Sequence, residues 1–228
     1  MIEPKSNGLS NMEFSSARVR ARALVAAGLG LVWLAMLVGG TGAADQYILE
    51  TVYGGGHPAV VAVARVLTFI GATPVGVPLV ILGLMLLWLH RGRAAATAGF
   101  LVIAVGRAAV EAQKYGFHRI RPQIEPHLAI ATSPSFPSGH ASNSMIACLA
   151  FALLMFGGSK WRPTAIATAL VLSFCIGLSR PVLGVHWPSD VVGGWSFGLA
   201  WVLLTLPLAR RIGIRYFPPA RGGGFNEE

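Results

Sequence analysis

Residues 133–143 read SPSFPSGHASN, and they separate two long apolar stretches of the chain. The segment combines two prolines and a glycine with several serines and one histidine, His140. Prolines and glycine favour a turn over a continuous helix. Ionisable residues at a membrane boundary are costly and usually functional. We therefore expect apolar helices on both sides of the segment and a functional site within it.

The composition indicates a protein whose solvent is lipid rather than water. Hydrophobic residues make up 54% of the 228 residues and charged residues only 12%, whereas a soluble domain carries about 25% charged residues. The net charge of +9 could suggest a nucleic-acid-binding protein. The basic residues, however, lie at the ends of apolar runs and form no single patch. We therefore expect no nucleic acid as a partner and predict an integral membrane protein.

Six apolar runs are long enough to cross a bilayer, which needs about 20 residues with some tolerance for shorter spans. They cover residues 23–40, 75–89, 94–110, 141–157, 164–178 and 191–208. The first run resembles a signal peptide, but its length favours a retained first helix. Gly194 and Gly198, one turn apart in the last run, predict close helix packing. The predicted fold is an all-α integral membrane protein with a bundle of six transmembrane helices.

A further apolar segment, residues 58–70, is interrupted by Arg65 and is expected to form an interfacial helix on the outer side. Most of the eighteen Lys and Arg residues fall on the inner side if the N-terminus is cytoplasmic, which predicts that orientation. The chain then divides into a cytoplasmic segment, residues 1–22, a membrane domain, residues 23–210, and a cytoplasmic tail, residues 211–228. The end of the tail, RGGGFNEE, is expected to be disordered.

The basic residues that remain on the outer side cluster in three segments at one end of the expected bundle. KYGFHRIRP follows the third apolar run, SPSFPSGHASN precedes the fourth, and SRPVLGVHWPSD joins the fifth and sixth. Their cations can converge on a multiply charged anion, because Arg forks match phosphate oxygens and Lys supplies a point charge. Ser138 and Gly139 add backbone N–H groups at a helix N-terminus, which also bind anions.

Two histidines and one carboxylate in these segments suit phosphoryl transfer. His186 and Asp190 are four residues apart and share a face if the sixth helix has begun there. A carboxylate on one imidazole nitrogen fixes the tautomer and leaves the other nitrogen free to attack. His140 is then available as a general acid for the leaving group. The Lys and Arg side chains would neutralise charge in place of a metal ion, so we expect transfer through a phosphohistidine.

The three segments together resemble the type 2 phosphatidic acid phosphatase (PAP2) superfamily of membrane lipid phosphatases. The family pattern is K-x6-R-P, then P-S-G-H, then S-R-x5-H-x3-D, and every position is filled here with unchanged spacing. The resemblance implies that His186 is the nucleophile, Asp190 orients it and His140 protonates the leaving group. It implies phosphate binding by Lys114, Arg121, Ser138, Gly139 and Arg180. It also implies that no metal ion or other cofactor is required.

The resemblance further implies a bacterial enzyme in the inner membrane that acts on a lipid phosphate, with both termini cytoplasmic and the active site on the periplasmic side. Candidate substrates are undecaprenyl diphosphate, phosphatidylglycerol phosphate, phosphatidic acid and lipid A; the short chain favours a prenyl diphosphate or a glycerophospholipid. Transfer of the phosphoryl group to another lipid is an alternative. An anion or lipid transporter is a remote one, because its site would lie near the midplane between repeats.

Several residues near the motifs have less specific roles. His118 and Arg119 are expected to be loop or headgroup contacts, with help in substrate binding as the alternative. Arg107 and Glu111, four residues apart, predict an intrahelical ion pair, although Glu111 could instead steady Lys114. Residues 123–132, QIEPHLAIAT, are expected to form a lid or headgroup-contact loop whose apolar residues dip into the membrane interface. These apolar residues are Leu128, Ala129 and Ile130.

Overall fold

The computed structural model describes residues 7–217, and these residues form eight helices and no strand. The helices in chain order are α1 (Asn7–Gly39), α2 (Ala43–Val52), α3 (Pro58–Gly71), α4 (Thr73–Arg91), α5 (Arg93–Phe117), α6 (Gly139–Met155), α7 (Arg162–Val182) and α8 (Pro188–Tyr216). The expected all-α fold is confirmed. The tail segment RGGGFNEE, which we expected to be disordered, lies outside the described residues.

Five of these helices are long and apolar enough to cross a membrane. They are α1 over Val19–Gly39, α4, α5, α7 and α8. The fourth apolar run forms α6, but this helix has 17 residues and falls just short of that length. Each of the six expected runs is therefore helical, while the sixth crossing stays a prediction.

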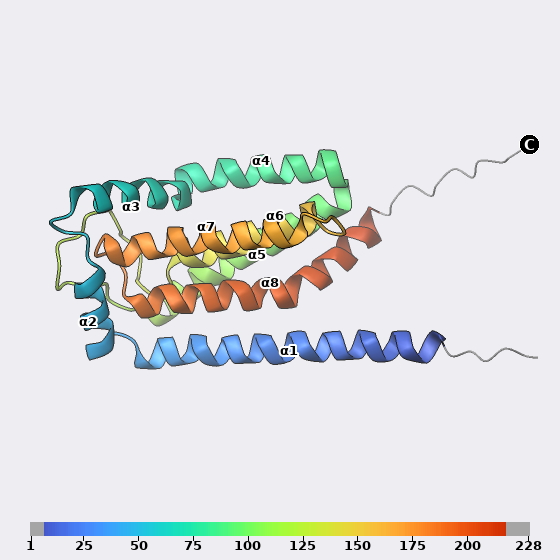
Figure 1. Ribbon diagram of the computed structural model, residues 1–228, viewed down its shortest axis with the longest axis horizontal. Helices are drawn as coiled ribbons and strands as arrows, with labels where there is room; N and C mark the ends of the chain where they lie inside the picture. Colours follow the sequence, from blue (N-terminus) through green and yellow to red (C-terminus); the bar gives the residue numbers. More distant parts are fainter. Residues whose placement is uncertain (1–6, 218–228) are drawn as a thin grey trace, which may run out of the picture.

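The long helices alternate in direction along one axis, as Figure 1 shows. α1 begins and α8 ends at one end of the bundle, and α2 and the long loop before α6 lie at the other. The C-terminal ends of α5 and α7 therefore meet the N-terminal ends of α6 and α8. These four helix ends carry the three segments that the sequence singled out.

The short helices differ in part from the expectation. The segment expected to be interfacial forms α3, which runs along the bundle nearly in line with α4 (Figure 1). The element that lies across the bundle end is α2, which the sequence did not predict. Its ten residues include Asp45 and Glu50, so they form no long apolar run.

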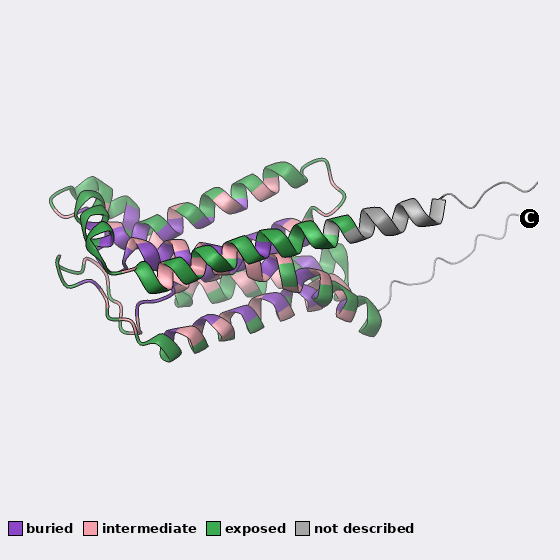
Figure 2. Ribbon diagram, turned by 90° about the horizontal axis from the view of Figure 1, so that it is seen from below, coloured by how far each residue is buried: buried purple, intermediate pink, exposed green. Residues whose placement is uncertain are grey.

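The core forms around α6, which packs against α4, α5, α7 and α8. Its side chains join those of its neighbours in one apolar cluster that includes Leu87, Val102, Met145, Ile146 and Val202. In Figure 2, α1 is exposed along most of its length and packs on the outside of the bundle. It packs mainly along α8, and Trp33 also donates to Oε1 of Gln113 in α5 at 3.0 Å.

Glycines allow α8 to approach α6 closely, as expected. A Cβ atom at Gly194 would lie 3.0 Å from the carbonyl oxygen of Ser138, and one at Gly198 would lie 2.9 Å from that of Ser142. Both distances are too short for a side chain without a shift of the backbone. The small residues thus hold the first turn of α6 beside the first turn of α8, where the site residues lie.

Candidate active site

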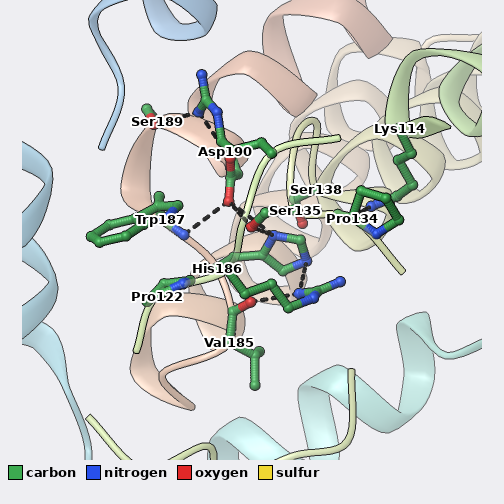
Figure 3. Close-up of polar contacts among 12 residues, drawn as sticks. Lys114, Pro122, Pro134, Ser135, Ser138, Val185, His186, Trp187, Ser189 and Asp190 are labelled. Carbon is green, nitrogen blue, oxygen red and sulfur yellow. Dashed lines mark hydrogen bonds and ion pairs between the residues drawn. The ribbon is translucent and has the colours of Figure 1, made fainter. Parts of the chain in front are cut away.

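The residues that the sequence singled out come together at one end of the bundle. Lys114 lies in the last turn of α5, Arg180 in the last turn of α7, and Asp190 in the first turn of α8. The remaining ones lie in the loops between α5 and α6 and between α7 and α8, or at the start of α6: Arg121, Ser138, Gly139, His140 and His186. Figure 3 shows this arrangement around His186 and Asp190.

The carboxylate of Asp190 is the most heavily bonded group of the site. Its Oδ2 atom accepts hydrogen bonds from the backbone N–H of Trp187 at 2.9 Å and from Oγ of Ser135 at 2.5 Å. Oδ1 accepts one from Arg119 at 3.0 Å, and Nδ1 of His186 lies 3.2 Å from Oδ2. The side chain is fully buried, so these donors replace the water that a carboxylate would otherwise bind.

The other nitrogen of His186 fixes the tautomer of the ring. Its Nε2 atom lies 3.0 Å from a guanidinium nitrogen of Arg121. A guanidinium can only donate, so Nε2 accepts and Nδ1 carries the proton that is donated to Asp190 (Figure 3). The arrangement leaves the lone pair of Nε2 on the side of the cations, as a nucleophile requires.

Burial and the nearby cations keep His186 uncharged. Burial lowers the pKa of this histidine well below its usual value, and the positive charges of Arg121, Lys114 and Arg180 lower the pKa further. Burial also lowers the pKa of Arg121, and the negative charge of Asp190 partly offsets this lowering. The arginine nevertheless stays protonated at any pH of interest. His186 is therefore a neutral base at pH values where an ordinary histidine is charged.

Three cations lie close to His186: Lys114 and Arg180 are buried, and Arg121 is half-buried. Lys114 donates to the carbonyl oxygen of Pro134 at 2.8 Å, Arg180 donates to Oγ1 of Thr68, and Arg121 contacts His186 as described. Within residues 19–217, none of the three forms an ion pair. Like charges gathered at one place are unfavourable unless an anion neutralises them, so the arrangement is suited to bind a multiply charged anion.

Buried polar atoms without partners point to the same conclusion. Among the described residues, Oγ of Ser138 and Nε of Arg180 are buried and have no hydrogen-bond partner. Such atoms are rare in folded proteins and call for a ligand or water. The expected role of the Ser138 backbone is wrong in one respect, because its N–H donates to the carbonyl oxygen of Asp190 at 2.9 Å. The hydroxyl of Ser138 is the group that is free to bind an anion.

His140 lies in the first turn of α6 and packs against the junction of α3 and α4. A Cβ atom at Gly71 would lie 2.8 Å from Cδ2 of the imidazole ring. Its Nε2 atom is 3.1 Å from the carbonyl oxygen of Thr68 and must carry a proton, because a carbonyl only accepts. Gly139 lies beside Lys114, since a Cβ atom there would be 3.4 Å from Cε of the lysine.

The loop of residues 123–132 exposes only one of the three apolar residues that were expected to dip into the membrane interface. Leu128 and Ala129 pack against Val185 and its neighbours, and the N–H of Leu128 donates to the carbonyl oxygen of Leu183 at 2.9 Å. Ile130 is 93% exposed. Of the three residues expected to dip into the membrane interface, Ile130 alone is exposed.

The expected pairing of Arg107 with Glu111 is wrong. Arg107 donates instead to Oγ1 of Thr73 at 3.2 Å, at the start of α4. Within the described part of the chain, Glu111 forms no ion pair with Arg107 or with Lys114. An exposed ion pair along one helix stabilises it by only about 0.5 kcal/mol, so the contact between helices prevails.

The expectation for Arg119 is also wrong, and two further residues were missed. The Arg119 side chain is only 9% exposed and is paired with Asp190, so it is neither a headgroup contact nor a substrate ligand. His118, by contrast, is exposed at the end of α5, as expected for a loop residue. Ser135 and Thr68 contact site residues, but no local pattern marks either role. A serine near prolines resembles an ordinary turn, and Thr68 lies in an apolar helix.

The sequence and the fold have counterparts among known proteins. Residues 95–213 match the PAP2 superfamily. This chain belongs to the PAP2 superfamily. The resemblance seen in its three motifs is thereby confirmed.

Relatives within the PAP2 superfamily are lipid phosphatases by name. Phosphatidylglycerophosphatase B of Bacillus subtilis (strain 168) is 30% identical over 143 residues, which cover 61% of this chain and 70% of the relative. Lipid A 1-phosphatase of Rhizobium johnstonii is 36% identical over 120 residues, which cover 52% of this chain and 45% of the relative. This chain thus spans less than half the length of the second relative.

A solved PAP2 structure has the same fold. The crystal structure of a transmembrane PAP2 type phosphatidylglycerolphosphate phosphatase from Bacillus subtilis aligns with a TM-score of 0.74 at 27% sequence identity. The alignment covers 82% of this chain and 96% of the Bacillus chain. The helix arrangement described above is therefore that of a PAP2 membrane phosphatase.

The protonation state of His186 can be measured directly. We expect 15N NMR of protein labelled at histidine to show His186 neutral, with the proton on Nδ1, at pH values below the usual histidine pKa of about 6.5. Its signal is assigned by its loss in His186→Gln. A proton on Nε2, or titration of the ring at its usual pKa, would contradict the geometry described here.

Proposed function

We propose that this protein is a membrane lipid phosphatase that releases inorganic phosphate from a lipid monophosphate or diphosphate through a phosphohistidine at His186. The observation that carries the proposal is a neutral, buried His186 whose Nε2 atom contacts Arg121, with the buried cations Lys114 and Arg180 close by. The lipid phosphatase names of the PAP2 relatives support it.

In the first step the Arg121 N–H moves from Nε2 of His186 to a phosphoryl oxygen, and the freed lone pair of Nε2 attacks phosphorus in line with the lipid oxygen. A P–N bond forms while the P–O bond to the lipid breaks. Lys114, Arg121 and Arg180 neutralise the charge on the phosphoryl oxygens, and the hydroxyl of Ser138 donates to one of them. Asp190 stabilises the positive charge that develops on the ring, because its carboxylate accepts the hydrogen bond from Nδ1–H.

His140 provides the proton for the leaving lipid oxygen. In the proposed step His140 acts as the imidazolium, which the bound phosphate anion favours. Its Nε2–H leaves the carbonyl oxygen of Thr68 and is given to the lipid oxygen, so that a neutral imidazole remains. Water then attacks the phosphohistidine and gives its proton to His140, and the P–N bond breaks to release phosphate from His186. Every step uses side chains of this chain, and the proposal includes neither a metal ion nor another cofactor.

An apolar cavity beside the site supports a lipid substrate. It has a volume of about 380 Å³ and lies between α4, α5 and α6. Gly71, which contacts His140, is at one end of its lining, and Leu84, Ile103 and Phe151 line its walls. An acyl or prenyl chain in this cavity would place its phosphate near the cations.

We propose a glycerophospholipid phosphate or a prenyl diphosphate as the substrate class. The name of the Bacillus relative favours phosphatidylglycerol phosphate, with phosphatidic acid and undecaprenyl diphosphate next. A lipid A phosphatase and a lipid-to-lipid phosphotransferase are the alternatives within the same chemistry. Transport of an anion or lipid remains a remote alternative.

The proposed setting is the inner membrane, which the chain crosses six times with α6 as the short fourth span. Residues 1–22 and 211–228 would be cytoplasmic, residues 23–210 would form the membrane domain, and the site would face the periplasm. The distribution of Lys and Arg supports this orientation. The start of α1 and the end of α8 at one end of the bundle agree with an even number of crossings.

Loss of the nucleophile should abolish the activity. We expect His186→Ala to reduce phosphate release by about a thousandfold or more, measured on purified protein with phosphatidylglycerol phosphate, phosphatidic acid, undecaprenyl diphosphate and lipid A. His57→Ala, at an exposed histidine before α3, is the control. EDTA should leave the rate unchanged. Full activity of His186→Ala, or loss of activity with EDTA alone, would contradict the mechanism.

The cavity should affect long-chain lipids only. We expect Ala147→Phe, which fills the cavity, to lower kcat/KM for a long-chain lipid phosphate by about tenfold, because the buried chain loses apolar contact. Phosphate release from a short-chain, soluble phosphate ester should be unchanged. Ala167→Phe, at an exposed position of α7, is the matched control. An equal loss for both substrates would argue against a lipid chain in this cavity.

A further inference from the structure

Arg119 lies outside the three motifs, yet it contacts the carboxylate that orients His186. One guanidinium nitrogen donates to Oδ1 of Asp190 and to Oγ of Ser189, both at 3.0 Å. Both members of this ion pair are buried, with side chains 9% and 0% exposed. A buried ion pair is favourable only when its geometry is good and its remaining donors are satisfied.

The end of α1 satisfies the other half of the guanidinium. The second terminal nitrogen donates to the carbonyl oxygens of Met36 at 2.8 Å and Leu37 at 2.6 Å. The last carbonyls of a helix have no partner within the helix and form the negative end of its dipole. The Phe136 ring covers one face, with its centroid 4.3 Å from Cζ of Arg119. Arg119 is therefore fixed on both edges and one face.

The two oxygens of Asp190 receive different partners. Oδ2 accepts from Ser135 and Trp187 and faces His186, whereas the side-chain donor to Oδ1 is Arg119. None of the hydrogen bonds of Arg119 goes to a residue of the proposed phosphate site. Any effect of Arg119 on the chemistry must therefore pass through Asp190.

We propose that Arg119 is a positioning residue for the reaction at His186. It holds the carboxylate of Asp190 in the orientation that accepts the hydrogen bond from Nδ1–H of His186. The end of α1 in turn holds Arg119. The inference rests on the proposed function and extends it. It gives a role to α1, which precedes the part of the chain that matches the PAP2 superfamily.

A second contact at Ser189 links α2 to α8 without touching the carboxylate of Asp190, and it offers a matched control. Oδ1 of Asp45 accepts from the backbone N–H of Ser189 at 2.9 Å, and Oδ2 accepts from the Ser189 hydroxyl. Oδ2 also accepts from the N–H of Thr41 at 2.7 Å. Asp45→Asn therefore weakens the link of α2 to α8 and leaves Asp190 with all its donors.

The test is a double-mutant cycle with Arg119→Gln and Asp190→Asn in the full chain. The substrate is an aryl phosphate, whose good leaving group keeps slow variants measurable. We expect Arg119→Gln to lower kcat by about 10- to 100-fold with KM within about twofold, because Arg119 makes no contact with the phosphate site. In the Asp190→Asn background the same change should have almost no effect. Asp45→Asn should retain kcat.

Two further measurements keep the test decisive. Arg119→Lys keeps the positive charge but loses the paired donors of the guanidinium. It replaces Arg119→Gln in the cycle if Arg119→Gln does not fold. Thermal unfolding in detergent shows whether each variant is folded. 15N NMR of His186 reads the tautomer without any substrate, so it still applies if no tested phosphate is cleaved and the proposed function fails. We expect Arg119→Gln to place part of the proton on Nε2.

Three results would overturn the proposal. Arg119→Gln could lower kcat by the same factor with and without Asp190→Asn, Asp45→Asn could cause an equal loss, or the His186 tautomer could be unchanged in Arg119→Gln. Each would mean that Arg119 only clamps α1 to the bundle.

Discussion

The rest of the site depends on the hydrogen bonds that the carboxylate of Asp190 accepts. It lies at the first turn of α8 and accepts hydrogen bonds from the loop before α6 through Ser135, from the start of the α5–α6 loop through Arg119, and from His186 in the loop before α8. Its own backbone carbonyl accepts from Ser138, the residue before α6. One residue thus orients the nucleophile and joins two parts of the α5–α6 loop to the start of α8, more than fifty residues further along the chain.

Much of the architecture could be predicted from the sequence, because its signals are local. The six apolar runs all form helices, and the three motifs lie at helix ends or in loops where polar residues interrupt the apolar pattern. The helices nevertheless extend past the apolar runs. The third run ends at residue 110, but α5 continues to Phe117 and so presents Lys114 from a helix. Hydropathy marks where a helix meets lipid, whereas the backbone continues as a helix into the site.

The parts that could not be predicted depend on contacts across long sequence separations. Arg119 and Ser135 each reach Asp190, more than fifty residues further along the chain, and Thr68 of α3 contacts His140 and Arg180. No spacing rule reveals such pairs. The local rule for charges four residues apart was misleading for Arg107, because a hydroxyl on the neighbouring helix offered a partner. α2 escaped notice because it is short and partly polar.

The central claim is that His186 carries the phosphoryl group between two steps of the reaction. Rapid quenching of the purified protein with phosphatidylglycerol phosphate into alkali, which preserves phosphohistidine, followed by mass spectrometry of its peptides, tests this most directly. The account predicts phosphate on His186 during turnover and none in His186→Ala. Release of inorganic phosphate without phosphate on His186, or with phosphate on another residue, would contradict it.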